Sequence, residues 1–580
     1  MKRLLIYLQD YKKECVLAPL FKMLEASFEL LVPLVIAAII DTGIGESAGK
    51  GYITKACLIL FALAFVGLVS SVTAQFFSAK AAVGYATKLR NALFGHLQSM
   101  SYSEIDTIGT STMITRMTSD VNQTQTGVNM FLRLFLRSPF VVFGAMIMAY
   151  TIDAKSAISF AVAIVLLLVV VCGITKISIP LMKQVQGQLD DVLLTARENL
   201  VGIRVIRAFC KEEEEVQRFA EKNMKLTAGQ KKAGSVSALM NPLTYIIINL
   251  AIVYLIWTGA VQVDRGILTQ GQVVALYNYM SQILVELVKL ANLIVTLNKA
   301  MASANRISEV FAIESSMADG TKELKTVTQD LEGAEEQPYI HYDHVCLTYS
   351  GSKEESLTDI DFTVKKGQTV GVIGGTGCGK TSLVHLLPRF YDVTKGAVLL
   401  DGINVKDYKQ EDLREKVSIV MQKAVLFKGS IRENLQWRKA DATDEEIMEA
   451  VTAAQALDVV EKKGGLDGEI EQNGRNLSGG QRQRLSIARA LVGNPEIIIL
   501  DDSSSALDFA TDAALRKSLK ELKGEPTVFI VSQRTSSIQH ADLILVLEDG
   551  DLVGKGTHEE LLKSCEVYQE IYMSQYKKEE

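Results

Sequence analysis

The sequence contains little cysteine, and the spacing of its cysteines excludes the sites that this residue usually builds. There are seven cysteines among 580 residues, which is an odd number, and no two of them form a CxxC pair. Disulfide frameworks use an even set of cysteines, and structural zinc sites use closely spaced pairs. The sequence therefore indicates neither a disulfide-stapled scaffold nor a zinc site.

An excess of positive charge is also missing. The 61 lysines and arginines are outnumbered by 67 aspartates and glutamates, and the net charge is −6. A nucleic-acid-binding domain usually carries a basic patch or stripe, so no nucleic-acid partner is indicated. Because 48% of the residues are hydrophobic and 22% are charged, a disordered or collagen-like chain is excluded as well.

The hydrophobic residues gather in the first half of the chain, in runs long enough to cross a membrane. A helix that crosses the hydrocarbon core needs about 20 apolar residues. Four windows contain no Asp, Glu, Lys or Arg, namely 56–78, 156–175, 233–263 and 266–285. We predict six membrane-spanning helices, at about 16–40, 54–80, 132–152, 156–178, 238–263 and 267–297. Buried core helices of a large soluble domain are the alternative, and they account poorly for so many windows.

The basic residues between these spans set the expected orientation. With the N-terminus inside the cell, the outer loops 42–53, 153–155 and 264–266 each hold one basic residue. The inner loop 179–237 alone holds ten, and positive residues concentrate on the cytoplasmic side. We therefore expect a multi-pass protein of the bacterial plasma membrane with a cytoplasmic N-terminus and helical inner loops.

Several charged residues lie inside the predicted spans. Lys22, Glu25 and Glu29 follow helical spacing in the first span, and Glu286 and Lys289 lie in the sixth. Charges at membrane depth are costly and usually face a cavity or a partner. Two interpretations remain open: these residues line a transport cavity, or they belong to cytoplasmic helix extensions and local i,i+3 pairs.

The pattern changes after residue 337. Short β-branched runs, such as 369–373, 497–500 and 527–531, alternate with helical stretches, which is typical of a cytoplasmic α/β domain. We expect a two-part chain. It has an all-α transmembrane domain of six helices over 1–313, a linker over 314–337 and an α/β domain over 338–580.

A phosphate-binding loop follows the first of these strands. Residues 374–381 read GGTGCGKT, which fits G-x4-G-K-[ST], and lie between the strand 369–373 and the helical run 382–387. Glycines let backbone N–H groups surround phosphate oxygens, and the helix N-terminus adds its positive end. Lys380 is expected to bind the β- and γ-phosphates and Thr381 to bind Mg²⁺. The alternative is a chance glycine-rich turn, which would not need a strand before it and a helix after it. We therefore expect an α/β domain of the P-loop type.

Two further motifs complete the pattern. The strand 497–500 ends in Asp501 and Asp502, and an acidic residue there is placed to hold Mg²⁺. Residues 477–481 read LSGGQ ahead of the helical run 485–491, which offers a second helix N-terminus to phosphate. In this order and spacing, the motifs resemble the nucleotide-binding domain of ATP-binding-cassette (ABC) transporters. Six spans ahead of one such domain resemble an exporter-type half-transporter (type IV, B-family multidrug-like) over the whole chain.

The resemblance implies a set of binding residues. Tyr349 matches the aromatic residue that stacks on adenine, Gln422 matches the Q-loop glutamine, and Asp508 belongs to the D-loop. The implied Mg²⁺ ligands are Thr381, Gln422 and Asp501. The implied ATP-binding residues are Tyr349, Gly374, Thr376, Gly377, Cys378, Gly379, Lys380, Thr381, Ser382, Gln422, Ser478, Gly479, Gly480, Gln481 and Asp508.

Two catalytic positions depart from the family pattern. The family usually has Glu, which polarises the attacking water, at the position of Asp502, and a switch histidine at the position of Gln533. Gln533 can hydrogen-bond a γ-phosphate, but it carries no charge. Asp is one methylene shorter than Glu, and a misplacement of ~1 Å can cost ~10²-fold in rate. We therefore expect the site to bind ATP and Mg²⁺ and to cleave ATP poorly. Gln472, where exporters often have Glu, is a milder difference.

The resemblance also implies an assembly. In the family, two nucleotide domains dimerise head to tail, and each ATP lies between the phosphate loop of one chain and the LSGGQ of the other. The intact LSGGQ would complete the site of a second half-transporter that supplies its own Glu and His. This predicts one subunit of an ATP-driven heterodimeric exporter in the lipid bilayer, with a small-molecule, lipid or peptide cargo. Two alternatives stay open: an ATP-gated regulatory or channel protein, and a homodimeric exporter that hydrolyses slowly with Asp502.

Overall fold

The computed structural model describes residues 2–45, 50–322 and 338–576. The chain divides into two compact units. Unit 1 comprises Met1–Gln98 and Ser111–Ile313, and unit 2 comprises Ser99–Thr110 and Glu314–Glu580. Most of the expected linker, at 323–337, lies outside the described residues.

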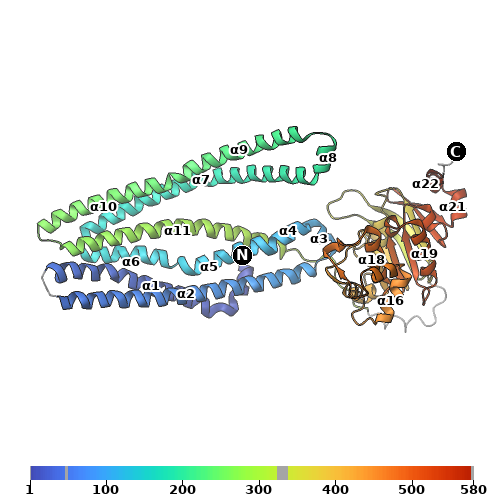
Figure 1. Cartoon of the computed structure of the whole chain (residues 1–580), viewed down its shortest axis with the longest axis horizontal. Helices are drawn as coiled ribbons and strands as arrows, with labels where there is room; N and C mark the ends of the chain where they lie inside the picture. Colours follow the sequence, from blue (N-terminus) through green and yellow to red (C-terminus); the bar gives the residue numbers. More distant parts are fainter. Residues whose placement is uncertain (1, 46–49, 323–337, 577–580) are drawn as a thin grey trace. The chain divides into compact units, whose positions relative to one another are not determined.

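Unit 1 is entirely helical where it is described, and its long helices run side by side (Figure 1). In the described part of the chain, six helical segments are long and apolar enough to cross a membrane: Leu4–Gly45, Lys50–Gln98, Thr110–Ile152, Ala154–Val201, Glu212–Asp264 and Gln270–Val310. Five of the predicted spans fall inside one of these segments, and the sixth, 267–297, begins three residues ahead of Gln270. The all-α six-helix prediction is confirmed. The elements are η1 (Lys2–Tyr11), α1 (Lys12–Ala38), η2 (Ile39–Gly45), α2 (Lys50–Gln98), α4 (Thr110–Thr115), η3 (Arg116–Asp120), α5 (Val121–Leu134), α6 (Arg137–Ile152), α7 (Ala154–Val201), α8 (Ile203–Ala208), α9 (Glu212–Ala238), α10 (Met240–Asp264) and α11 (Gln270–Val310).

Small residues let these helices approach closely. A Cβ added to Gly127 in α5 would lie 2.2 Å from the Cβ of Ala300 in α11, and one added to Gly144 in α6 would lie 2.5 Å from Leu30 in α1. Close backbone approach through small residues is how helices associate where lipid replaces water. Glycine at these two positions therefore sets the packing of α5 on α11 and of α6 on α1.

The charged residues of the predicted spans are paired with one another. Arg137 at the start of α6 binds Glu286 of α11 and Glu29 of α1, the latter over 2.7 Å. The hydroxyl of Ser138 donates to Glu286 over 2.8 Å, and Lys289 lies 2.8 Å from the same carboxylate. Arg137 and Glu286 are 6% and 2% exposed. The expected i,i+3 pair between Glu286 and Lys289 is thus present. The carboxylate of Glu286 also binds Arg137, a buried arginine 149 residues away in the sequence.

Removing one member of this buried cluster is expected to destabilise unit 1 strongly. Arg137→Met leaves the buried carboxylate of Glu286 without its main partner, and such losses cost about 3–5 kcal/mol. Thermal unfolding of the chain in lipid nanodiscs measures the effect. Lys289→Met, which removes a half-exposed partner of the same carboxylate, serves as the control and should have a small effect. An unchanged unfolding temperature in Arg137→Met would show that the cluster does not stabilise the helix packing.

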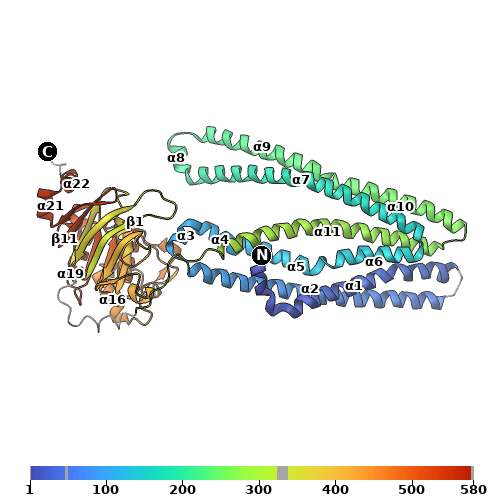
Figure 2. The same ribbon diagram turned by 180° about the vertical axis from the view of Figure 1, so that it is seen from behind.

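Unit 2 is an α/β fold, which confirms the predicted fold class (Figure 2). A six-stranded sheet has the order β12-β11-β3-β10-β9-β6, and a four-stranded sheet has the order β2-β1-β4-β5. The strands are β1 (Ile340–Leu347), β2 (Leu357–Val364), β3 (Thr369–Gly374), β4 (Lys395–Leu400), β5 (Ile403–Asn404), β6 (Val417–Val420), β7 (Gly429–Ser430), β8 (Glu469–Ile470), β9 (Ile497–Asp501), β10 (Thr527–Val531), β11 (Leu543–Glu548) and β12 (Asp551–Gly556). The helices are α3 (Tyr102–Ile108), α13 (Lys380–Leu386), α14 (Gln410–Lys416), α15 (Ile431–Leu435), α16 (Asp444–Ala453), α17 (Leu457–Lys462), η4 (Gln472–Gly474), α18 (Gly479–Leu491), η5 (Ser503–Ala506), α19 (Phe509–Lys520), α20 (Thr535–Ile538), α21 (His558–Ser564) and α22 (Glu566–Tyr576).

The parallel register of the large sheet brings three motifs to one edge. β10 lies between β3 and β9 and is parallel to both, with Val531 opposite Val372 on one side and Asp501 on the other. The carboxyl ends of these strands therefore meet at the same edge. In α/β sheets this edge is where ligands bind.

The short helix α3 belongs to unit 2 although the helices before and after it in the sequence belong to unit 1. Its Tyr102 ring stacks on Phe390 with 4.5 Å between ring centroids. The hydroxyl of Tyr391 donates to Asp106 over 2.7 Å. These contacts dock α3 against the segment that follows α13.

Candidate functional site

The predicted phosphate loop joins β3 to α13. Gly379 has φ of +94°, and a Cβ added there would lie 2.7 Å from the carbonyl oxygen of Ser356, so the turn requires glycine. Nζ of Lys380 donates to the carbonyl oxygens of Gly374 and Gly375 over 3.0 and 2.5 Å. The side chain of Lys380 is thereby curled inside the loop, where its ammonium group can meet phosphate oxygens.

Thr381 and Asp501 form the candidate Mg²⁺ site. The Thr381 hydroxyl donates to Oδ1 of Asp501 over 3.0 Å, although the two residues are 120 positions apart. Burial raises the pKa of Asp501, and the neighbouring Asp502 adds to the rise, whereas the hydrogen bond from Thr381 and the charge of Lys380 lower it. Hydroxyl and carboxylate oxygens at one point are ligands that suit Mg²⁺. A bound cation would hold the carboxylate ionised.

Asp502 and Gln533, the two positions expected to weaken hydrolysis, lie at the same edge of the sheet. Nε2 of Gln422 donates to Oδ2 of Asp502 over 3.3 Å. Asp502 has φ of +44°, a left-handed backbone conformation that is uncommon for residues other than glycine. Gln533 follows the end of β10 and lines the same cavity as Gln422 and Asp502. The carboxylate of Asp502 is therefore bonded to Gln422 at this edge of the sheet.

A cavity of about 730 Å³ joins these residues. Its volume falls in the range of sites that take a small molecule or cofactor, about 300–1,000 Å³. Of the predicted residues it is lined by Tyr349, Thr376, Gly377, Gly379, Lys380, Thr381, Ser382, Gln422, Asp501, Asp502 and Gln533. The other described residues that line it are Ser352, Glu354, Glu355, Ser356, Val531, Asp549 and Gly550, which carry no motif that the sequence could have revealed.

Several predicted residues lie elsewhere. Gly374 and Cys378 are in the loop but do not line the cavity, and the Sγ of the buried Cys378 lies 3.6 Å from Nζ of Lys380. The cavity lining, as far as the described residues go, also lacks Ser478, Gly479, Gly480, Gln481 and Asp508. This chain therefore does not bring its own LSGGQ to its phosphate loop.

The LSGGQ motif starts a helix. Ser478 is the N-cap of α18, with its hydroxyl accepting from the N–H of Gln481, and the Gln481 side chain accepts in turn from the N–H of Ser478 over 2.9 Å. This capping box fixes the helix start and leaves the N–H groups of two glycines free of bulky side chains. Asp508 caps α19 in a similar way, accepting from the N–H of Thr511 over 2.8 Å.

The aromatic residue expected to stack on adenine lies at the cavity wall. The hydroxyl of Tyr349 donates to Oγ of Ser382 over 2.8 Å, and its ring meets Tyr391 edge-on with centroids 5.0 Å apart. Burial raises the pKa of Tyr349, so its hydroxyl stays protonated at neutral pH. The ring is thus held in one position beside the phosphate loop.

His385 is a polar neighbour of the site that sequence analysis missed. Its Nε2 lies 3.7 Å from Oδ2 of Asp501, and the residue is 8% exposed. Burial lowers the pKa of His385 to about 4, so the ring is neutral at pH 7. A single histidine in the last turn of a short helix gives no signal of its position until the fold places α13 against β9.

The transmembrane region and the ATP-binding domain both match known families. Residues 15–287 match the ABC transporter transmembrane region, and residues 357–505 match the ABC transporter ATP-binding family. An uncharacterised ABC transporter ATP-binding protein of Bacillus subtilis, YfiB, is 34% identical over 580 residues, which cover 100% of this chain and 99% of that protein. The chain belongs to the ABC transporters.

Other relatives of this ABC transporter share its full length. An ATP-dependent lipid A-core flippase of Haemophilus ducreyi is 29% identical over 579 residues, covering 99% of this chain and 98% of that protein. A solved structure of a bacterial Atm1-family ABC exporter with ATP bound superposes with a TM-score of 0.80 at 22% identity, over 97% of this chain and 98% of that one. This likeness confirms the expected fold of six helices followed by an α/β nucleotide domain.

Proposed function

We propose that this ABC transporter is a subunit of an ATP-driven exporter of the bacterial plasma membrane, with its nucleotide domain in the cytoplasm. The named relatives include a lipid A-core flippase and a putative multidrug export protein, which supports a lipid or drug-like cargo. Docking of α3 beside α13 supports a mechanical link, because α3 follows α2 directly in the chain. ATP-driven closure would move α3 and, through it, the membrane helices.

We further propose that the chain's own site binds ATP with Mg²⁺ and hydrolyses it slowly. The single observation that carries this is the position of Asp502, whose carboxylate is bonded to Gln422 and is one methylene shorter than the usual Glu. Gln533, in place of the switch histidine, supplies a hydrogen bond to a γ-phosphate but no positive charge. The binding residues Lys380, Thr381 and Asp501 are all in place.

Slow hydrolysis at the chain's own site favours a heterodimer, in which a different chain supplies the faster site. Because the chain's LSGGQ does not line its own cavity, a second ABC chain has to supply one, and this chain's LSGGQ would complete the site of that partner. A partner with Glu and His at the two positions would then carry out most of the hydrolysis. The competing outcome is a homodimer, in which two copies of this chain complete each other's sites and hydrolyse ATP slowly.

The ATPase rates of two assemblies test the proposal. The full chain is purified alone and as a mixed assembly with a second ABC half-transporter that has Glu and His at the two positions, each in nanodiscs. We expect turnover in the mixed assembly to exceed that of the chain alone by about 10²-fold. Removing the partner's catalytic Glu should abolish the difference. Equal and rapid turnover by the chain alone would contradict the proposal.

A further inference from the structure

The segment that carries Gln533 is held by the last helix of the chain. α20 begins two residues after Gln533, and its N-cap, Arg534, makes no side-chain capping bond. The first N–H groups of a helix have no partner within the helix and need one from elsewhere. The N–H of Thr535 donates to Oε1 of Gln575, which lies in α22, over 2.9 Å. A residue 40 positions away therefore caps the helix behind the switch position.

Gln575 binds the segment at two residues. Its Nε2 donates to the carbonyl oxygen of Gln533 over 2.7 Å, and its Oε1 also accepts from the hydroxyl of Thr535 over 2.9 Å. A backbone N–H can only donate and a carbonyl oxygen can only accept, so these partners fix which end of the amide faces which residue. One side chain thus holds the backbone on both sides of Arg534.

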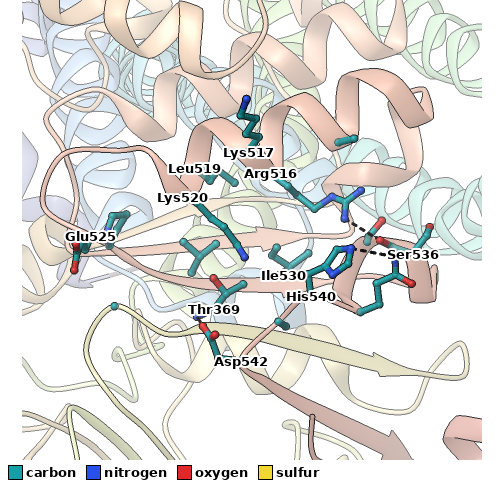
Figure 3. Close-up of a pocket in the computed structure, with 17 residues that line it drawn as sticks. Thr369, Arg516, Lys517, Leu519, Lys520, Glu525, Ile530, Ser536, His540 and Asp542 are labelled. Carbon is teal, nitrogen blue, oxygen red and sulfur yellow. Dashed lines mark hydrogen bonds between the residues drawn. The ribbon is translucent and has the colours of Figure 1, made fainter. Parts of the chain in front are cut away.

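Part of α20 lines a cavity. A pocket of about 670 Å³ lies between α19, β10 and α20, and Ser536 and Ser537 line it (Figure 3). Arg516 of α19 reaches across to donate to the carbonyl oxygen of Ser536 over 2.8 Å. α20 is therefore bound to α19 through Arg516 and through Asp512, which accepts from the hydroxyl of Ser537 over 3.1 Å. Gln575 binds it from α22, and Ile538 packs into the core.

The helix that carries Gln575 is itself anchored. Tyr568, near the start of α22, is fully buried, and its hydroxyl lies 2.7 Å from Nδ1 of His558. Gln575 is exposed, so solvent can reach the contact. α22 is thus a fixed support from which one side chain reaches the switch segment.

We propose that Gln575 is a positioning residue for the switch segment: it sets where Gln533 meets the γ-phosphate and so how strongly the chain prefers ATP to ADP. The inference rests on the proposed contact between Gln533 and the γ-phosphate. ADP lacks this phosphate, so a displaced Gln533 weakens the binding of ATP and leaves that of ADP unchanged.

The affinities of the full chain in nanodiscs for two nucleotides test this. AMP-PNP, which is not cleaved, stands for ATP, and ADP is the comparison, both with Mg²⁺. The preference is the ratio of the affinity for AMP-PNP to the affinity for ADP. Gln575→Ala should lower this ratio by about five- to tenfold, which corresponds to the loss of one hydrogen bond to the γ-phosphate. Gln575→Glu keeps the cap on Thr535 and loses the donor to Gln533, so it should shift the preference in the same direction. Gln569 lies in the same helix as Gln575 and donates to the carbonyl oxygen of Leu562 in α21 over 2.7 Å, and Gln569→Ala should leave the preference unchanged.

A double-mutant cycle separates positioning from general support. If Gln575 acts through Gln533, then Gln575→Ala has no further effect on the preference in a Gln533→Ala background. Equal losses of AMP-PNP and ADP affinity, or effects that add in the double variant, would overturn the inference. A shift in Gln533→Ala without one in Gln575→Ala would overturn it while leaving the role of Gln533 intact. No shift in Gln533→Ala would overturn both. Unfolding temperatures confirm that each variant is folded.

Discussion

Replacing Lys380 with alanine is expected to weaken the binding of Mg²⁺–ATP by about 100-fold or more. The ammonium group is curled inside the phosphate loop, 2.5 to 3.0 Å from two of its carbonyl oxygens. A hydrogen bond between charged groups contributes about 1.5–3 kcal/mol, and two such bonds to phosphate oxygens account for a loss of this size. Equilibrium binding of a labelled nucleotide to the full chain measures the effect.

A second lysine provides the control for this experiment. Lys366 lies just before β3, and its ammonium group is 3.3 Å from Glu496 at an exposed position. Surface ion pairs contribute little, so Lys366→Ala should leave nucleotide affinity within about twofold of the unchanged chain. Retained affinity in Lys380→Ala would mean that the loop at 374–381 is not the phosphate site.

Restoring the family's residues at the two altered positions should accelerate hydrolysis. The double variant Asp502→Glu, Gln533→His is expected to raise the ATPase rate of the chain alone by about 10²-fold. In the unchanged chain the carboxylate of Asp502 accepts from Gln422 over 3.3 Å. A Glu carboxylate at this position reaches one methylene further. The histidine adds a group that can carry positive charge beside the γ-phosphate. Steady-state phosphate release measures the gain.

The single variants show how the two positions share the effect. Each alone should give a smaller gain than the pair, because the two groups act on one reaction. Adding Lys380→Ala to the double variant should abolish the gain, which shows that the activity comes from this site. A double variant that binds ATP normally and remains as slow as the original chain would show that neither substitution limits the rate.

Local patterns predicted the fold and the phosphate-loop region well. The long uncharged runs are confirmed as helical segments of sufficient length, because membrane solvation leaves the sequence little freedom there. The strand at 527–531 is observed at the same residues, and Lys380, Thr381, Asp501, Asp502 and Gln533 meet at one cavity. A glycine-rich loop between a strand and a helix is a local feature, so its sequence contains most of the information.

Contacts between distant segments could not be predicted in this way. Arg137 and Glu286 are 149 residues apart, and the sequence offered Glu286 only its i,i+3 neighbour Lys289 as a partner. α3 contacts unit 2 through the stacked rings of Tyr102 and Phe390 and through the hydrogen bond from Tyr391 to Asp106, and these partners lie far apart in the sequence. Gln575 lies in an ordinary polar stretch, and only the packing of α22 places it against Thr535. Such pairings are fixed by the tertiary fold, and they produce no repeating pattern in the sequence that could predict them.

The identity of the nucleotide held by the chain alone tests the central proposal most directly. The purified full chain is incubated with labelled ATP and Mg²⁺ in nanodiscs, separated from free nucleotide, quenched in acid and analysed by chromatography at successive times. We expect about one nucleotide to be bound per chain and its conversion to ADP to take on the order of ten seconds, which is about 10²-fold slower than ordinary turnover. Conversion of the bound label to ADP within about a second, at the turnover of roughly 10 s⁻¹ that is ordinary for enzymes, would contradict it.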